Sequence, residues 1–152
     1  MQSLAKLVGN WTTEATHPQV PGTIVHGTAS VEWLEGEKFL IFRARTDHAQ
    51  FPDSISIIGS TAHGRAGEDG QVRADANDSL TMHYYDSRGV FREYAVTADD
   101  HAFRYSRDDP GFSQRFTGTY ADDGNTIRGQ SQLCTDGVTW KDDLAITYRR
   151  SK

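Results

Sequence analysis

Residues 80–97 read LTMHYYDSRGVFREYAVT, and this stretch decides the fold. Two runs rich in β-forming residues flank the turn Asp86-Ser87-Arg88-Gly89. Asp at the first turn position and Gly at the last favour a type I turn followed by a glycine bulge, because glycine adopts a positive φ readily. The stretch therefore predicts an antiparallel hairpin.

The turn also predicts the register of this hairpin, and the register decides which side chains share a face. With Asp86 flanking Val90, Tyr84 lies opposite Arg92. One face then carries Leu80, Met82, Tyr84, Arg92, Tyr94 and Val96, and the other carries Thr81, His83, Tyr85, Phe91, Glu93 and Ala95. The first set is mostly apolar, so we expect it to face the interior. His83 and Glu93 are then predicted to form an exposed cross-strand pair.

Similar turns that end in Gly recur along the chain, at residues 34–36, 122–124 and 135–137. They separate strands expected at 10–17, 23–34, 38–46, 54–59, 80–85, 90–97, 102–106, 112–120, 126–133 and 138–149. A meander of this length leaves two unpaired edges, and closure into a barrel removes them. We therefore predict one all-β domain over residues 1–152. It is a closed antiparallel up-and-down barrel of about ten strands, preceded by a short helical turn at 3–8.

Bulk composition excludes several classes of function. The net charge is −5 and no block of Lys or Arg could follow a phosphate backbone, so no nucleic-acid partner is expected. No apolar run has the length of a membrane helix, so no membrane partner is expected. The single Cys134 and an N-terminus without an apolar signal segment indicate a cytoplasmic protein. Homodimerisation stays open, and so does the segment Ser60–Ser79, as a lid, an insertion or a weak strand.

An inward Arg92 needs a partner, because a buried unpaired charge is costly. The last predicted strand alternates Val138, Trp140, Asp142, Leu144, Ile146 and Tyr148 on its apolar face, which predicts an inward Asp142. The hairpin of 112–120 with 126–133 is expected to bring Arg115 inward too. We therefore predict these ligand-binding residues: Met82, Tyr84, Arg92, Tyr94, Arg115, Trp140 and Asp142.

These side chains suit a small hydrophobic or amphipathic ligand with an anionic group. The arginines would hold the anion, the tyrosines would form hydrogen bonds, and Met82 and Trp140 would pack against the apolar part. Asp142 would be the counter-charge of the arginines. In a second interpretation Asp142 simply pairs with Arg92 inside a filled core and no ligand binds.

Gly9-Asn10-Trp11 on the first predicted strand resembles the G-x-W signature of the calycin superfamily, which includes lipocalins and fatty-acid-binding proteins. In those families the Trp closes one barrel end and an Arg from the last strand stacks over it. The sequence Tyr148-Arg149-Arg150 is placed to supply that Arg. Ten strands resemble the fatty-acid-binding and nitrobindin branches more than the eight-stranded lipocalins.

The chain also resembles small bacterial lipocalin-like proteins of unassigned function. The resemblance lies in residues 9–11, 32–36, 39–40, 83–89 and 110–116. Fatty-acid-binding proteins hold a carboxylate with an Arg and a Tyr two residues apart, and Arg92-Glu93-Tyr94 has this spacing.

Two other functions stay open. An isomerase or cyclase acting on a hydrophobic substrate could use Asp142 as a base, with Tyr84 or Tyr94. Haem binding, as in nitrobindin-like proteins, needs a His on a late strand, whereas the last His is His101, so it would require His83 or His101 to turn inward. No cofactor is predicted otherwise. No metal is expected, because the six histidines are dispersed.

Overall fold

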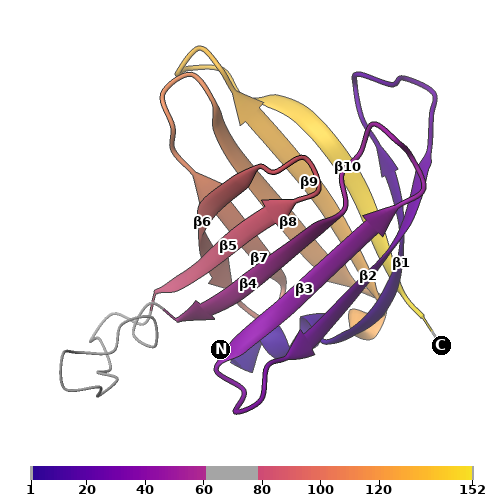
Figure 1. Cartoon of the computed structure of the whole chain (residues 1–152), viewed down its shortest axis with the longest axis vertical. Coiled ribbons are helices and arrows are strands. Elements are labelled where there is room, and N and C mark those ends of the chain that lie inside the picture. Colours follow the sequence, from indigo (N-terminus) through magenta and orange to yellow (C-terminus); the bar gives the residue numbers. More distant parts are fainter. Residues whose placement is uncertain (1, 61–78, 152) are drawn as a thin grey trace.

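The computed structural model describes residues 2–60 and 79–151, which form ten strands and two short 3-10 helices, one of them at the N-terminus (Figure 1). The segment between Ser60 and Ser79 lies outside the described residues apart from its two ends. No helix in the described part is long and apolar enough to cross a membrane. The elements are η1 (Gln2–Leu7), β1 (Gly9–Thr16), β2 (Val25–Trp33), β3 (Phe39–Thr46), β4 (Ser54–Ser60), β5 (Leu80–Asp86), β6 (Phe91–Ala98), β7 (Ala102–Arg107), β8 (Ser113–Ala121), η3 (Asp122–Gly124), β9 (Thr126–Cys134) and β10 (Lys141–Arg150).

The strands form a closed antiparallel barrel, as the turn pattern predicts. Each strand pairs with its neighbours in sequence, and β1 also pairs with β10 to close the cylinder. No strand of the cylinder is left as an unpaired edge, which is the physical advantage of closure. The calycin-like architecture expected from the sequence is therefore confirmed.

The β5–β6 hairpin has the predicted register. Tyr84 pairs with Arg92 and Met82 pairs with Tyr94. Gly89 has a φ of 85°, and its N–H donates to the Asp86 carbonyl over 2.9 Å, as the type I turn with a glycine bulge requires. On the outer face His83 and Glu93 lie opposite each other, with Nε2 and Oε2 3.8 Å apart.

Helix η1 closes one end of the barrel, which we name the closed end (Figure 1). Its Leu4 and Leu7 are buried, and the Leu7 carbonyl accepts a hydrogen bond from Trp11 Nε1 over 2.9 Å. The Arg150 guanidinium lies over the Trp11 ring, 4.2 Å from the ring centroid. It also donates to the carbonyls of Val8, Lys6 and Gly124 over 2.7, 3.1 and 3.1 Å. The closure expected from the calycin resemblance is thus formed by Trp11 and Arg150.

The opposite end, which we name the open end, carries the five connections at 17–24, 47–53, 87–90, 108–112 and 135–140. Inward side chains differ between the two halves of the barrel. Towards the closed end Leu40, Phe103 and Ile127 are at most 3% exposed. Towards the open end inward side chains such as Tyr84 and Arg92 stay only half-buried. The interior is therefore filled near η1 and more accessible near the connections.

The prediction that Val138, Trp140 and Asp142 share the inward face with Ile146 and Tyr148 is wrong, because β10 contains a β-bulge before Ala145. Its register on β9 shifts between Asp142 and Ala145, so that Asp142 pairs with Gln132 while Ile146 pairs with Gly129. The extra residue reverses the inside and outside alternation. Asp142 therefore faces outward and is exposed, and Val138 is 83% exposed, whereas Ile146 and Tyr148 face inward as predicted.

The predicted orientation of Arg115 is also wrong. The connection through η3 closes the β8–β9 hairpin with Ala121 opposite Thr126, which puts Arg115 opposite the outward Gln132. The inward face of β8 instead carries Phe116, Gly118 and Tyr120. The non-glycine residues Asp122 and Asp123 both have positive φ in this connection, a conformation that turn composition alone does not predict.

Candidate functional site

The inner faces of β5 and β6 bring together four of the predicted ligand-binding residues. Met82 and Tyr94 are each 5% exposed, whereas Tyr84 and Arg92 are half-buried nearer the open end. The Tyr84 and Tyr94 rings meet edge to face with centroids 6.4 Å apart. These four residues form one continuous strip from the filled core to the open end.

The other three predicted residues gather on the outer surface instead. The Arg115 guanidinium lies over the Trp140 ring, 4.1 Å from its centroid. Arg115 Nε donates to Gln132 Oε1 over 2.6 Å, and Gln132 Nε2 donates to Asp142 Oδ1 over 2.9 Å. Trp140 is half-buried by this contact. The expectation that Arg115, Trp140 and Asp142 line the interior is therefore wrong.

Asp86 lies at the open end of β5, and both oxygens of its carboxylate accept hydrogen bonds. Its side chain is 0% exposed. Oδ2 accepts from Tyr84 over 2.8 Å and from Arg88 Nη2 over 2.7 Å, and Oδ1 accepts from the Arg88 backbone N–H over 2.9 Å. The hydrogen bonds from Arg88, with that from Tyr84, hold the pKa of Asp86 well below its ordinary value. Burial and the Asp86 hydrogen bond raise the pKa of Tyr84, so its hydroxyl stays protonated.

Arg92 is the inward charge of this strip. Its guanidinium lies 5.4 Å from the centroid of the Phe112 ring at the open end. Among residues 2–60 and 79–151, no carboxylate lies within 4.0 Å of the Arg92 nitrogens. Asp142, the predicted counter-charge, is on the outer face. The interpretation in which Asp142 neutralises Arg92 inside a filled core is therefore wrong.

Tyr94 lies beside Arg92 and links it to the deeper wall. Its hydroxyl donates to Gln114 Oε1 over 3.1 Å. Burial raises the pKa of Tyr94, and the neighbouring Arg92 and Arg107 act in the opposite direction. Two cationic groups thus face this hydroxyl, but Arg107 is already paired with Asp109 over 2.9 Å. Arg92 is the one of the two whose charge is not neutralised by a described residue.

Aromatic rings line the wall below Arg92. Tyr94 and Tyr105 meet with centroids 5.0 Å apart, and Tyr105 stacks on Phe116 at 4.8 Å with 14° between the ring planes. Across the barrel Tyr148 contacts Trp11 and Phe42 with centroid distances of 6.4 and 6.1 Å. Such a wall favours a flat, apolar molecule, because aromatic rings pack well edge to face and offset.

Strands β6 and β7 separate near the open end. Their pairing runs from Ala95–Ser106 to Ala98–Phe103 and does not extend to Arg92 or Tyr94. A groove of about 530 Å³ occupies this part of the wall, and Tyr94 and Arg107 are among its lining residues. Thr81, Glu93 and Ser106, which also line this groove, lie on the outer face, so the groove belongs mainly to the outer surface of β5 to β7.

Sequence reasoning missed a polar pair at the open end, formed by His17 and Asp143. His17 Nε2 lies 2.8 Å from Asp143 Oδ1, and the two side chains are 16% and 28% exposed. His17 Nδ1 accepts the Gln19 N–H over 3.1 Å, so both ring nitrogens are engaged. The sequence pattern that could have predicted an inward His17 is the alternation along β1, in which Trp11, Thr13 and Ala15 are buried and His17 is the next residue on the same face.

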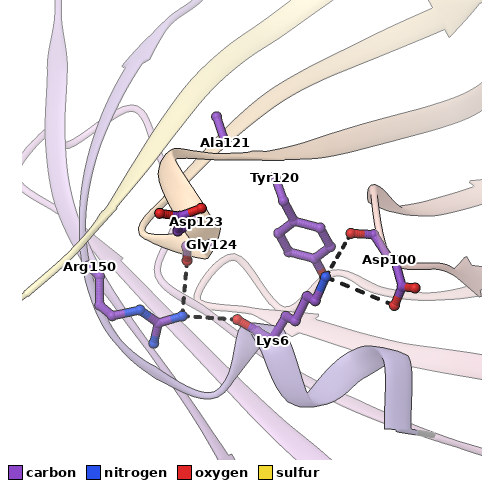
Figure 2. Close-up of a pocket in the computed structure, with 7 residues that line it drawn as sticks. All are labelled: Lys6, Asp100, Tyr120, Ala121, Asp123, Gly124 and Arg150. Atoms are coloured by element: carbon purple, nitrogen blue, oxygen red, sulfur yellow. Dashed lines mark hydrogen bonds and ion pairs between the residues drawn. The ribbon is translucent and has the colours of Figure 1, made fainter.

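A second hollow, of about 400 Å³, lies at the closed end (Figure 2). Its two cations bind the protein itself: Lys6 Nζ donates to the Asp100 carbonyl over 2.8 Å, and Arg150 donates to the Lys6 and Gly124 carbonyls. Burial and the nearby Asp99 raise the pKa of Tyr120 in its wall to about 12. This hollow is the outer side of the Trp11–Arg150 closure, and we assign it a structural role.

Two expectations from the sequence concern metal and haem ligands. Within residues 2–60 and 79–151, no three His, Cys, Asp or Glu side chains cluster closely enough to hold a metal ion. His83 lies on the outer face, and His101 is exposed in the β6–β7 turn. The haem hypothesis requires one of these two histidines to turn inward, and neither does.

With this geometry described, the barrel can be compared with known proteins. No protein-family model and no curated protein matches the chain. The crystal structure of Rv2717c from M. tuberculosis has a TM-score of 0.63 at 13% identity, over 99% of this chain and 96% of that one. The S-type phycobiliprotein lyase CPES from Guillardia theta has a TM-score of 0.54 at 10% identity, over 99% of this chain and 92% of that one. At these identities the likeness shows the calycin-like barrel and not a shared function.

Proposed function

We propose that the barrel binds a small organic anion with an apolar or aromatic body, and that Arg92 receives the anionic group. The observation that carries this proposal is the inward, half-buried guanidinium of Arg92, which no described carboxylate neutralises. A guanidinium withdrawn from water is costly without a counter-charge, and a carboxylate or sulfonate can supply two charge-assisted hydrogen bonds. The spacing of Arg92 and Tyr94 also resembles the carboxylate site of fatty-acid-binding proteins.

The surroundings of Arg92 support an amphipathic ligand over a simple inorganic ion. Phe112 lies on one side of the guanidinium, and the rings of Tyr84, Tyr94 and Tyr105 continue from it into the barrel. A ligand with its charge at Arg92 would bury its apolar part against these rings, which contributes about 25 cal/mol per Å² of apolar surface removed from water. The structural similarity to a phycobiliprotein lyase is compatible with a barrel that binds an organic molecule, but it identifies no binding residue in this chain.

The enzyme alternative has less support. Its base, Asp142, is on the outer face, and Asp86 is held by Tyr84 and Arg88. Burial keeps the hydroxyls of Tyr84 and Tyr94 protonated, which suits hydrogen-bond donors better than bases. Binding without turnover is therefore the function we propose.

Two fluorescent probes test the role of Arg92. The probe 8-anilinonaphthalene-1-sulfonate is an aromatic anion, and N-phenyl-1-naphthylamine carries the same two ring systems without the sulfonate. For Arg92→Gln we expect the Kd of the anionic probe to rise about tenfold to a hundredfold, because a charge-assisted hydrogen bond contributes roughly 1.5–3 kcal/mol. The Kd of the neutral probe should change less than about twofold.

The matched control is Arg128→Gln. Arg128 lies on the outer face of β9, is exposed, and also has no ion pair among the described residues. It should leave both values of Kd unchanged. If Arg92→Gln and Arg128→Gln have the same effect on the anionic probe, Arg92 is not the anion site and the proposal fails.

A further inference from the structure

We infer that the chain forms a two-fold symmetric homodimer through the outer face of β3 to β6, with β3 of one copy lying over β6 of the other. The partner on this face is a second copy of the chain itself. The inference does not depend on the proposed function, because this face is the outside of the wall whose inner side carries Arg92.

A row of large apolar side chains crosses this face near the open end. Ile55, Tyr85 and Phe91 are neighbours on β4, β5 and β6, because Ile55 pairs with Tyr85 and Tyr85 pairs with Phe91. Phe91 is 76% exposed and Tyr85 is 47% exposed. Single exposed apolar residues are ordinary on a protein surface, whereas a contiguous row of them marks an interaction surface.

The adjacent row of residues widens this apolar surface. Ile41 and Ile57 pair across β3 and β4, which lie side by side in Figure 1, and Ile57 also pairs with the outward His83. Strand β4 thus carries Ile55 and Ile57 on its outer face, while the inward Ser56 between them is buried. A sheet face that meets water normally carries polar residues, so this reversed alternation favours a covered outer face. We name the five apolar side chains the outer patch: Ile41, Ile55, Ile57, Tyr85 and Phe91.

Opposite charges border the outer patch on its two sides. Arg43 lies on β3 beside Ile55, and Glu93 lies on β6 at the other side. Their side chains are 47% and 71% exposed. Arg43 donates from Nη1 to Glu32 over 2.6 Å, which leaves other N–H groups of its guanidinium to donate, and Glu93 lies 3.8 Å from His83. Both charges can therefore form a further ion pair with a partner.

A two-fold axis parallel to the strands makes this face complementary to itself. Such an axis exchanges the two sides of the sheet between the copies, so β3 lies over the partner's β6 and β4 over the partner's β5. Arg43 then approaches the partner's Glu93 and Phe91, twice in the dimer, and Ile55 packs against the partner's Tyr85. An axis perpendicular to the strands would instead place β3 over β3 and bring the two copies of Arg43 together, which like charges disfavour.

Sedimentation velocity over a concentration series of the full chain tests the interface. We expect the wild type to approach twice the chain mass of 16.9 kDa as its concentration rises. Phe91→Asp should raise the Kd of the dimer at least about thirtyfold, because it places a carboxylate in the centre of an apolar contact. The fold should persist, since Phe91 is exposed in the single chain, and circular dichroism verifies this.

The matched control for Phe91→Asp is Val138→Asp. Val138 is 83% exposed in the connection between β9 and β10, away from the outer patch. The substitution introduces the same charge at an exposed apolar residue and should leave the Kd of the dimer within about twofold of the wild type.

Charge reversal tests the predicted pairing of Arg43 with Glu93 across the axis. Arg43→Glu and Glu93→Arg should each raise the Kd of their own dimer at least about tenfold, because each creates two like-charge pairs across the interface. An equimolar mixture of the two variants should form a heterodimer, since each Arg then faces a Glu. A fluorescent label on one variant reports this heterodimer, whose Kd should be closer to that of the wild type than to that of either variant alone.

Each of three other results would overturn the inference. The first is a wild type that stays at the mass of one chain across the concentration series. The second is a dimer that responds equally to Phe91→Asp and Val138→Asp, because its interface would then lie elsewhere. The third is a mixture of the two charge-reversal variants that associates no more tightly than either variant alone, because Arg43 would then not face the partner's Glu93.

Discussion

Tyr84 donates its hydroxyl proton to Asp86 over 2.8 Å, two residues further along the same strand. The bond is possible because both side chains point inward on β5, one above the other, and Arg88 closes the carboxylate from the turn. The residues next to the proposed anion site are therefore ordered by the hairpin itself. Four predictions follow from this and other contacts.

The Asp86 contacts predict a pH-dependent stability. The Arg88 and Tyr84 hydrogen bonds lower the pKa of Asp86 from its ordinary value of 3.8, so the folded state favours the ionised carboxylate. This contribution to the free energy of unfolding is fully present above pH 3.8 and is lost as the pH falls towards the lower pKa of the folded state. In urea unfolding, the stability difference between the wild type and Asp86→Asn should be constant from pH 7 to 5 and shrink below pH 4. A difference that grows on acidification would contradict the assignment.

Arg150→Met should destabilise the barrel strongly. The substitution removes donors from the carbonyls of Val8, Lys6 and Gly124 and the cation over Trp11. We expect a loss of about 3 kcal/mol and a fall in Tm of roughly 6–12 °C, measured by circular dichroism.

The control for Arg150 is its neighbour Arg149. Arg149 is exposed and pairs with Glu14 over 3.3 Å, with half of each side chain in solvent. Arg149→Met should change the stability by less than about 1 kcal/mol. Equal losses for the two variants would show that the Trp11 closure contributes little.

Asp143→Ala should cost about 1–2 kcal/mol of unfolding free energy, because it leaves His17 Nε2 without its acceptor at the end of β1. The neighbouring Asp142→Ala is the control, since Asp142 is exposed on the outer face, and it should cost less than about 0.5 kcal/mol. Chemical denaturation at pH 7 measures both. The reverse order would mean that the bulge does not orient Asp143 towards His17.

Arg115→Gln and Asp142→Asn should leave the affinity for 8-anilinonaphthalene-1-sulfonate within about twofold of the wild type. Both residues face outward in the β8–β9–β10 sheet, so they do not reach a ligand inside the barrel. Fluorescence titration alongside Arg92→Gln gives the comparison. A tenfold loss in either variant would place the probe on the Arg115–Trp140 surface and contradict binding inside.

Local chemistry allowed the part of the site on β5 and β6 to be predicted from the sequence. The turn from Asp86 to Gly89 predicts the register that puts Tyr84 and Arg92 on one face, and the apolar residues of that face predict that it points inward. The Trp11 end was predicted in another way, from the resemblance of Gly9-Asn10-Trp11 to the calycin signature. Gly9 has a φ of 141°, and a Cβ there would collide with the Arg150 guanidinium.

The residues on β8 to β10 could not be assigned in the same way. The extra residue of the β10 bulge is held by Ser131 and Gln130 from the adjacent strand: the Leu144 N–H donates to Ser131 Oγ over 2.9 Å, and Gln130 Nε2 donates to the Leu144 carbonyl over 3.2 Å. A regular alternation along β10 gives no sign of these contacts, which is why Asp142 was expected inside.

By itself, then, the sequence determined the strands, their closure and the hairpin with Arg92 and Tyr94, because these depend on alternation and on turns of a few residues. The Trp11 end was predicted from the calycin resemblance. The tertiary structure decided the orientation of Arg115, Trp140 and Asp142 and the His17–Asp143 pair. Those features depend on a β-bulge, on strand register and on contacts between residues far apart in the sequence, which local patterns do not encode.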